Sequence, residues 1–203
     1  MTAPATFGTE ALMPALGAYR KIAPEVEVDI TLTDRNVDLV EEGFDVAFRI
    51  GSMRDSSMIA RRLAPYRMAV CAAPDYLTRA GTPAHPRELE QHETIAFSPS
   101  ARAPWRFVRQ GEEVDVTPIR MITVNSGQAV RTAAQAGLGV IMQPEILVRR
   151  DIENGALIRL FPDWPLRERP MWLLYYRDRK MTPRLRSFIT FATSAFAAPE
   201  SLS

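Results

Sequence analysis

Cysteine is almost absent from this chain, and its scarcity limits both the chemistry and the location of the protein. The 203 residues include one cysteine, Cys71, so no disulfide can form within the chain. Cys71 lies in an apolar run at residues 68–73, a setting typical of a buried and unreactive thiol. A lone reduced thiol fits a reducing compartment, and no charged leader with an apolar core opens the sequence. We therefore expect a cytoplasmic protein.

Residues that usually carry catalysis or bind metals are also scarce. The only two histidines, His85 and His92, flank a predicted surface helix, so we expect exposed side chains and not a metal pair. The chain has no G-x-S-x-G turn, no phosphate-binding loop with lysine and no H-E-x-x-H motif. The Gly137-Leu138-Gly139 segment falls at a predicted helix end, which disfavours a nucleotide site. The sequence predicts no enzyme activity, no cofactor and no metal.

Strong charge and long apolar runs are missing as well. The formal net charge is +1 and the chain has no basic block, so it lacks the electrostatic signature of a DNA-binding surface. No apolar run approaches the roughly 20 residues that a membrane-spanning helix needs. We expect no membrane contact and no specific DNA binding by this chain alone.

The most informative stretch that is present covers residues 26–51. Val26, Val28, Ile30 and Leu32 alternate with polar residues, which predicts a strand with one buried face. A short helix capped by Asp34 or Asn36 should follow, with apolar residues Val37, Leu39 and Val40. Gly43 stands where a left-handed residue would end that helix, and residues 44–50 read as a buried strand. A strand, a helix and a strand in this order predict a βαβ unit with parallel strands.

Strand and helix patterns alternate along the rest of the chain, which predicts an α/β fold. Thr6 or Thr9 could cap a helix ending near residue 22, and Ser126 could cap one at residues 127–136. Gln110-Gly111-Glu112 indicates a hairpin. Thr182 and Pro183 supply a cap and a first-turn proline for a last helix.

Four segments resemble the effector-binding domain of LysR-type transcriptional regulators. They are DLVEEGFDVAFRIG within residues 38–51, APATFG at residues 3–8, ARRLAPYRMAVCAAPDYL at residues 60–77, and VNSGQAVRTAAQAGLGVIMQP at residues 124–144. The segments occur in the order of the family and span nearly the whole chain. The winged helix-turn-helix that precedes this domain in the family is absent.

The resemblance implies an architecture and a function. It implies two Rossmann-like lobes with a cleft between them, similar to type II periplasmic binding proteins. Lobe I would hold residues 1–73 and 174–203, and lobe II residues 74–173. A small-molecule effector would bind in the cleft of a homodimer or tetramer, and DNA would be bound only through a missing N-terminal domain. The alternative is a solute-binding protein of a transport system.

Polar residues at strand ends and helix starts are the expected effector site, because ligands of open α/β sheets bind beyond the carboxyl ends of the strands. Caps alone would explain Thr6, Thr33 and Asp34 equally well. Arg49 could bind an anionic effector or pair with Asp45 or Asp34. With the resemblance, the expected effector-binding set is Thr6, Phe7, Thr33, Asp34, Arg49, Ser98, Asn125, Ser126, Gln143 and Pro144.

The resemblance also suggests an antiparallel dimer. The helix at residues 10–22 would pack against residues 119–136 of a two-fold-related copy. Expected contacts from the first helix are Met13, Ala18 and Arg20, and expected contacts from the second region are Val130, Arg131 and Ala134. A solvated helix face remains the alternative.

Overall fold

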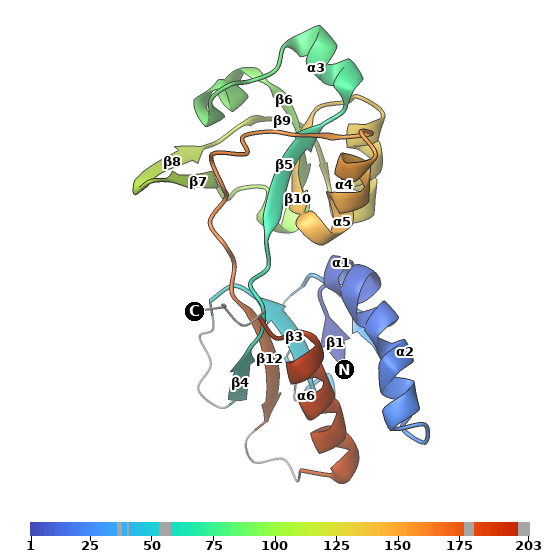
Figure 1. Cartoon of the computed structure of the whole chain (residues 1–203). Helices are drawn as coiled ribbons and strands as arrows, with labels where there is room; N and C mark the ends of the chain where they lie inside the picture. Colours follow the sequence, from blue (N-terminus) through green and yellow to red (C-terminus); the bar gives the residue numbers. More distant parts are fainter. Residues whose placement is uncertain (36–37, 40, 53–57, 177–180, 199–203) are drawn as a thin grey trace. The chain divides into compact units, whose positions relative to one another are not determined.

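The computed structural model describes residues 1–35, 38–39, 41–52, 58–176 and 181–198 and divides into two compact units. Unit 1 comprises Met1–Tyr66 and Arg169–Ser203, and unit 2 comprises Arg67–Glu168 (Figure 1). These divisions differ from the expected ones after residues 73 and 173. The physical reason is strand pairing, since residues 68–72 join the sheet of unit 2 and residues 171–176 join the sheet of unit 1.

Unit 1 is built on a five-stranded mixed sheet. Strands β1, β2 and β3 run parallel, as the predicted βαβ pattern requires, and β12 runs antiparallel to both β3 and β4. The strand order is β2-β1-β3-β12-β4. The strands are β1 (Thr2–Ala3), β2 (Thr31–Leu32), β3 (Ala47–Ile50), β4 (Met58–Arg62) and β12 (Met171–Tyr176).

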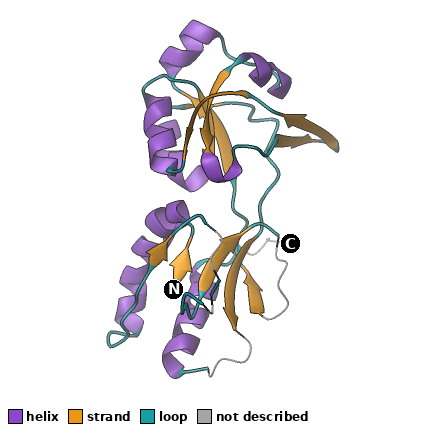
Figure 2. Ribbon diagram, turned by 180° about the vertical axis from the view of Figure 1, so that it is seen from behind, coloured by secondary structure: helices purple, strands orange, loops and turns teal. Residues whose placement is uncertain are grey.

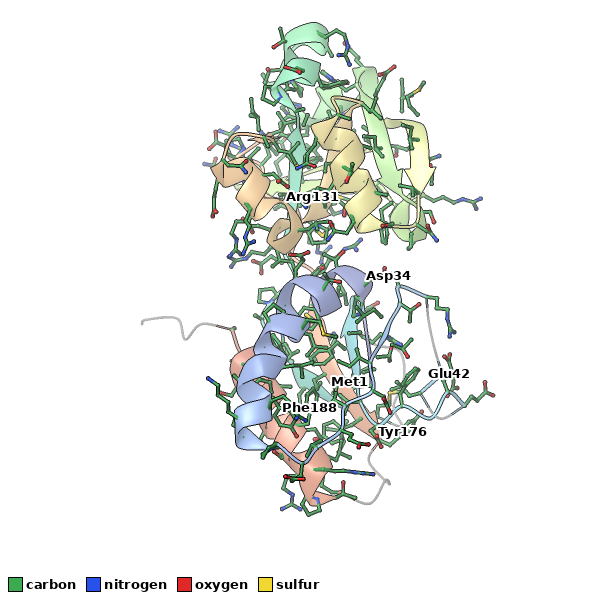
Figure 3. All side chains as sticks on the ribbon, turned by 90° about the vertical axis from the view of Figure 1, so that its right-hand side faces the viewer. Met1, Asp34, Glu42, Arg131, Tyr176 and Phe188 are labelled. Atoms are coloured by element: carbon green, nitrogen blue, oxygen red, sulfur yellow. The ribbon has the colours of Figure 1, made fainter. Side chains whose placement is uncertain are left out.

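Opposite faces of this sheet have different covers because neighbouring strand residues point to opposite sides. Phe48 is fully buried against the ring of Phe188 on α6 (Pro183–Ala195), which shares its face of the sheet with α2 (Met13–Ile22) (Figures 1 and 3). Ala47 and Leu174 point the other way and pack with Leu39. The aromatic side of the sheet is therefore the main core of unit 1.

The first helix is continuous and contains one irregular turn. It consists of α1 (Ala5–Phe7), a π-helical turn η1 (Gly8–Leu12) and α2. Leu12 and Tyr19 are buried on one face of this helix, and Leu16 between them is half-buried. The prediction of Thr6 or Thr9 as the helix cap was wrong. The helix begins after Pro4, and the proline side chain cannot accept a hydrogen bond. Gly8 lies close to Leu32, since a Cβ at position 8 would lie 2.2 Å from a methyl of Leu32 and would require that side chain to move.

The segment between β2 and β3 differs from its prediction. The described residues at 38–39 and 41–43 form turns and not a helix, and Asn36, Val37 and Val40 lie outside the described residues. Gly43 does adopt the predicted left-handed conformation, with φ 71°. Strand β2 pairs with β1 through two residue pairs only. The apolar residues Val26, Val28 and Ile30 that precede β2 are half-buried but lie outside this strand pairing.

Unit 2 has a second five-stranded sheet with a separate hairpin. The strand order is β11-β5-β10-β6-β9, with β10, β6 and β9 parallel and β5 antiparallel to its neighbours. The sheet strands are β5 (Met68–Ala72), β6 (Glu93–Phe97), β9 (Ile119–Val124), β10 (Val140–Pro144) and β11 (Ile158–Arg159). The predicted hairpin is confirmed as β7 (Trp105–Arg109) and β8 (Glu112–Val116), with Gln110 at φ 50° in its turn.

Helices and the hairpin cover the two faces of this sheet (Figure 2). Cys71 and Ile141 face α4 (Gly127–Gln135) and α5 (Glu145–Glu153). On the opposite face, Val70 and Val140 pack with the hairpin, with α3 (Pro74–Ala80) and with the short helix η2 (Pro86–Gln91). A further short turn is η3 (Ser98–Ser100). Across the described part of the chain, no helix has the length and apolarity needed to cross a bilayer.

Candidate functional site

The strand ends of unit 1 bring several predicted residues together. Because β1, β2 and β3 are parallel, their carboxyl ends lie at one edge of the sheet, where α1 also begins. The Ala5 N–H donates to Oδ1 of Asp34 at 3.3 Å, so Asp34 caps the helix that starts after β1 (Figure 3). The Thr33 N–H donates to the Ala3 carbonyl at 2.9 Å, and the Thr33 hydroxyl accepts from the Arg35 N–H. Thr6 is half-buried in the first helical turn.

Burial shapes the electrostatics of this edge. Burial raises the pKa of Asp34, and the hydrogen bond from Ala5 opposes that rise. Tyr66 lies nearby and is 8% exposed; burial, then the negative charges of Asp34 and Glu10, raise its pKa. The edge therefore presents a neutral phenol beside a carboxylate. Nothing in the local sequence around Tyr66 signalled this proximity, because the two residues are far apart in the chain.

Arg49 is the one cation of the predicted set, and its surroundings are unusual. Its Nη1 donates to the carbonyl of the preceding Phe48 at 3.2 Å, and Nη2 is buried with no hydrogen-bond partner among the described residues. Burial lowers the pKa of Arg49, Glu42 opposes that shift and Arg35 adds to it. Glu42 is held by both terminal nitrogens of Arg35, at 2.8 and 2.6 Å.

The expected ion pairs of Arg49 are not formed within the described part of the chain. The carboxylate of Asp34 accepts from Ala5, and no salt bridge joins it to Arg49. The negative charge of Asp45 acts on the amino group of Met1, whose pKa it raises against the larger lowering effect of burial. A buried guanidinium N–H without an acceptor is costly, so Arg49 has the chemistry of an anion receptor.

The predicted residues of unit 2 divide into exposed and buried groups. Ser98, Asn125 and Ser126 are exposed at the carboxyl ends of the parallel strands β6 and β9. The Ser126 hydroxyl accepts the Ala129 N–H at 3.3 Å, which confirms the predicted helix cap. The first N–H groups of α4 therefore lie beside exposed polar side chains, a geometry suited to anions.

Three other predicted residues are buried. Gln143 is 2% exposed and lies on the sheet face covered by α4 and α5, and Pro144 is buried beside it. In unit 1, the ring of Phe7 packs 5.0 Å from the rings of both Phe48 and Phe196. Phe7 therefore supports α1 from inside the core and does not present its side chain at the edge.

Among the described residues, the two histidines and Cys71 do not form a metal site or a reactive thiol site. His92 was predicted to be exposed, but it is buried, because its Nδ1 lies 3.1 Å from the buried hydroxyl of Tyr76. His85 accepts the Arg87 N–H at 3.2 Å. Burial raises the pKa of Cys71 to about 12, so the thiolate that reacts is scarce at neutral pH. No group of three or more potential metal ligands occurs among the described residues.

Comparison with known proteins identifies this two-unit domain. The family model for the LysR substrate binding domain matches residues 1–197. An HTH-type transcriptional regulator of Escherichia coli K12, YhjC, is 33% identical over 185 residues, which cover 88% of this chain and 60% of that protein. PtxR, an HTH-type transcriptional regulator of Pseudomonas aeruginosa, is 33% identical over 190 residues, which cover 93% of this chain and 61% of that protein.

Solved structures give the same result. The regulatory domain of CrgA, a LysR-type transcriptional regulator from Neisseria meningitidis, has a TM-score of 0.84 at 28% identity and covers 97% of each chain. The chain spans less than two thirds of the length of the two relatives named above. Because the relatives are transcriptional regulators, the alternative of a transport solute-binding protein is set aside. The chain belongs to the LysR substrate-binding domain family.

Proposed function

We propose that this chain is the sensing domain of a cytoplasmic transcriptional regulator without enzyme activity. A small organic effector binds to it, and DNA is bound by a module outside this chain. Support comes from the family match over residues 1–197 and from relatives that extend well beyond the matched region. The near-zero net charge supports a division of labour in which this chain does not itself bind DNA.

We propose an anionic effector, and the observation that favours it is the buried Nη2 of Arg49, which has no hydrogen-bond partner in the part of the chain that the structure describes. Both units offer polar groups at the carboxyl ends of parallel strands, and the proposed contacts are drawn from these two sets. The proposed contacts are Thr6, Thr33, Asp34 and Arg49 of unit 1 and Ser98, Asn125 and Ser126 of unit 2. Gln143 and Pro144 are omitted, because both side chains are buried within unit 2. Phe7 is omitted, because its side chain lies in the aromatic core.

A screen of organic acids by thermal shift and calorimetry tests this proposal. We expect at least one acid to bind, and we expect Thr33→Ala and Ser126→Ala each to weaken it by about 0.5–2 kcal/mol, the value of one hydrogen bond. Thr78→Ala is the control, since it removes an exposed hydroxyl whose partner is the Pro74 carbonyl on α3. If Thr33→Ala and Ser126→Ala both left the affinity unchanged, the proposed effector contacts would be wrong.

We also propose that the domain forms an antiparallel dimer through two exposed apolar surfaces. Met13, at 44% exposure, and the exposed Ala18 lie on α2. In unit 2, the edge strand β9 exposes Ile119 and Met121 by 53% and 60%. Apolar side chains gathered on an unpaired strand edge favour a partner. The expected contacts of Val130 and Ala134 were wrong, because both side chains are fully buried in the core of unit 2.

Charge substitutions on these surfaces test the dimer. Two-fold symmetry repeats each contact, so one substitution changes the interface twice. We expect Ala18→Glu and Met121→Glu each to weaken dimerisation by about tenfold or more, which corresponds to roughly 1.4 kcal/mol. Ile158→Glu on β11, at the opposite sheet edge from β9, is the matched control. Light scattering would count against the dimer if the wild-type chain stayed monomeric at high micromolar concentration.

A further inference from the structure

A cavity lies wholly within unit 2, and its lining contains none of the proposed effector contacts. Its volume is about 350 Å³, which lies within the range of small-molecule pockets. Its walls come from the first residues of β5, from β7 and from residues 160–166. The apolar part of the lining includes Phe107, Phe161, Trp164 and Leu166. This wall suits a flat apolar group.

Hydrogen bonds hold residues 160–166 over this cavity at both ends. The Leu160 N–H donates to the Val70 carbonyl at 2.9 Å, and the Val108 N–H donates to the Pro165 carbonyl at 2.9 Å. Between these ends, Phe161 has φ 55°, a left-handed conformation that is unfavourable for a residue with a side chain. Its ring packs edge-on against Phe107, with centroids 5.5 Å apart. Backbone strain of this kind is concentrated at ligand-binding positions.

Two ion pairs form the polar part of the lining. The Arg67 Nε donates to the Glu168 carboxylate at 2.8 Å, and an Arg159 terminal nitrogen donates to the Glu145 carboxylate. Each pair is joined by one hydrogen bond among the described residues, so further guanidinium N–H groups and a second carboxylate oxygen can take a ligand. The charges of the two arginines and the two glutamates cancel. A ligand with a single charge would be attracted by two of these side chains and repelled by the other two. A zwitterion matches both signs.

The Arg67–Glu168 pair also joins the first and last residues of unit 2. Next to it, Tyr66 and Arg169 exchange two backbone hydrogen bonds, of 2.8 and 3.2 Å. The two connections between the units are therefore tied together beside this cavity. A ligand that engages Arg67 and Glu168 therefore contacts both ends of the unit 2 segment.

We propose that this cavity is a second ligand site, which takes a small zwitterion carrying a flat apolar group, of the aromatic α-amino acid class. The apolar group lies against Trp164 and Phe161, and the charged groups bind the two ion pairs. This site is independent of the proposed effector site and does not require it.

L-Phenylalanine tests the proposal, with nuclear magnetic resonance of the tryptophan indole N–H groups as the readout. We expect the Trp164 signal to shift and the signal of Trp172, in unit 1, to stay in place. Two analogues control for charge: 3-phenylpropanoate lacks the ammonium group, and 2-phenylethylamine lacks the carboxylate. Each should bind about tenfold or more weakly than L-phenylalanine.

Variants then locate the site. Arg159→Gln and Glu168→Gln should each weaken L-phenylalanine binding by about tenfold or more. Arg106→Gln, which removes an exposed ion pair of the hairpin in the same unit, should leave it unchanged. The proposal is overturned if millimolar L-phenylalanine leaves the Trp164 signal unmoved, or if the analogues bind equally well. It is also overturned if Ser126→Asp, a change at the effector site, abolishes binding while Glu168→Gln does not.

Discussion

Asp151→Ala is expected to destabilise unit 2 by about 3 kcal/mol, because it removes the centre of the contact between α4 and α5. Arg131 donates Nε and Nη2 to the two oxygens of Asp151 at 2.5 and 2.6 Å, and Gln135 donates to the same carboxylate at 2.9 Å. The Asp151 side chain is only 4% exposed. Without it, the half-buried Arg131 loses the carboxylate that accepts two of its hydrogen bonds.

Asp115→Ala is the matched control for this prediction. Asp115 forms a similar two-bond pair with Arg106, at 2.7 Å for each bond, but both side chains are about 40% exposed on the hairpin. Exposed pairs contribute little, so we expect no measurable change in the unfolding midpoint. Urea unfolding followed by Trp105 and Trp164 fluorescence in a Trp172→Phe background reports unit 2. Equal effects of Asp151→Ala and Asp115→Ala would contradict the prediction.

Phe48→Ala should have the largest effect in unit 1, a loss of about 3–5 kcal/mol. Phe48 is fully buried, and its ring centroid lies 5.0 Å from that of Phe7, 5.8 Å from that of Phe196 and 6.4 Å from that of Phe188. Truncation leaves a cavity that this rigid set of rings fills poorly. Trp172, in unit 1, is the fluorescent reporter when the other two tryptophans are replaced. Phe48→Leu should cost less, and a cost as large as that of Phe48→Ala would argue against the cavity as the cause.

Local chemistry allowed several elements to be predicted from sequence. Ser126 was predicted to cap α4 and Thr182 to cap α6, and both side chains accept the expected backbone N–H. The hairpin turn at Gln110 was predicted from Gly111 beside it. Each signal lies within a few residues of the structure that it specifies, so it can be read without tertiary information.

Contacts between distant segments could not be predicted in this way. Asp34 was expected to cap a helix just after it, yet it caps the helix that begins at Ala5, because β2 lies beside β1 in the sheet. Val130 was placed on a surface, because the alanine-rich pattern of α4 does not reveal which face carries α5 and the sheet. Arg131 was likewise assigned to a partner, whereas its guanidinium binds Asp151. The burial of His92 could not be predicted either, because its side chain lies beside that of Tyr76 on α3.

Calorimetric titration of an anionic effector into the wild-type chain and two variants tests the central claim most directly. Arg49→Gln removes the one cation among the proposed contacts of unit 1. Ser126→Asp keeps the helix cap of α4 and puts a negative charge beside the first N–H groups of that helix. If the proposed contacts of each unit take part in binding, each variant weakens binding by about tenfold or more while circular dichroism is unchanged. Wild-type affinity in either variant would show that its unit takes no part, and would contradict the account.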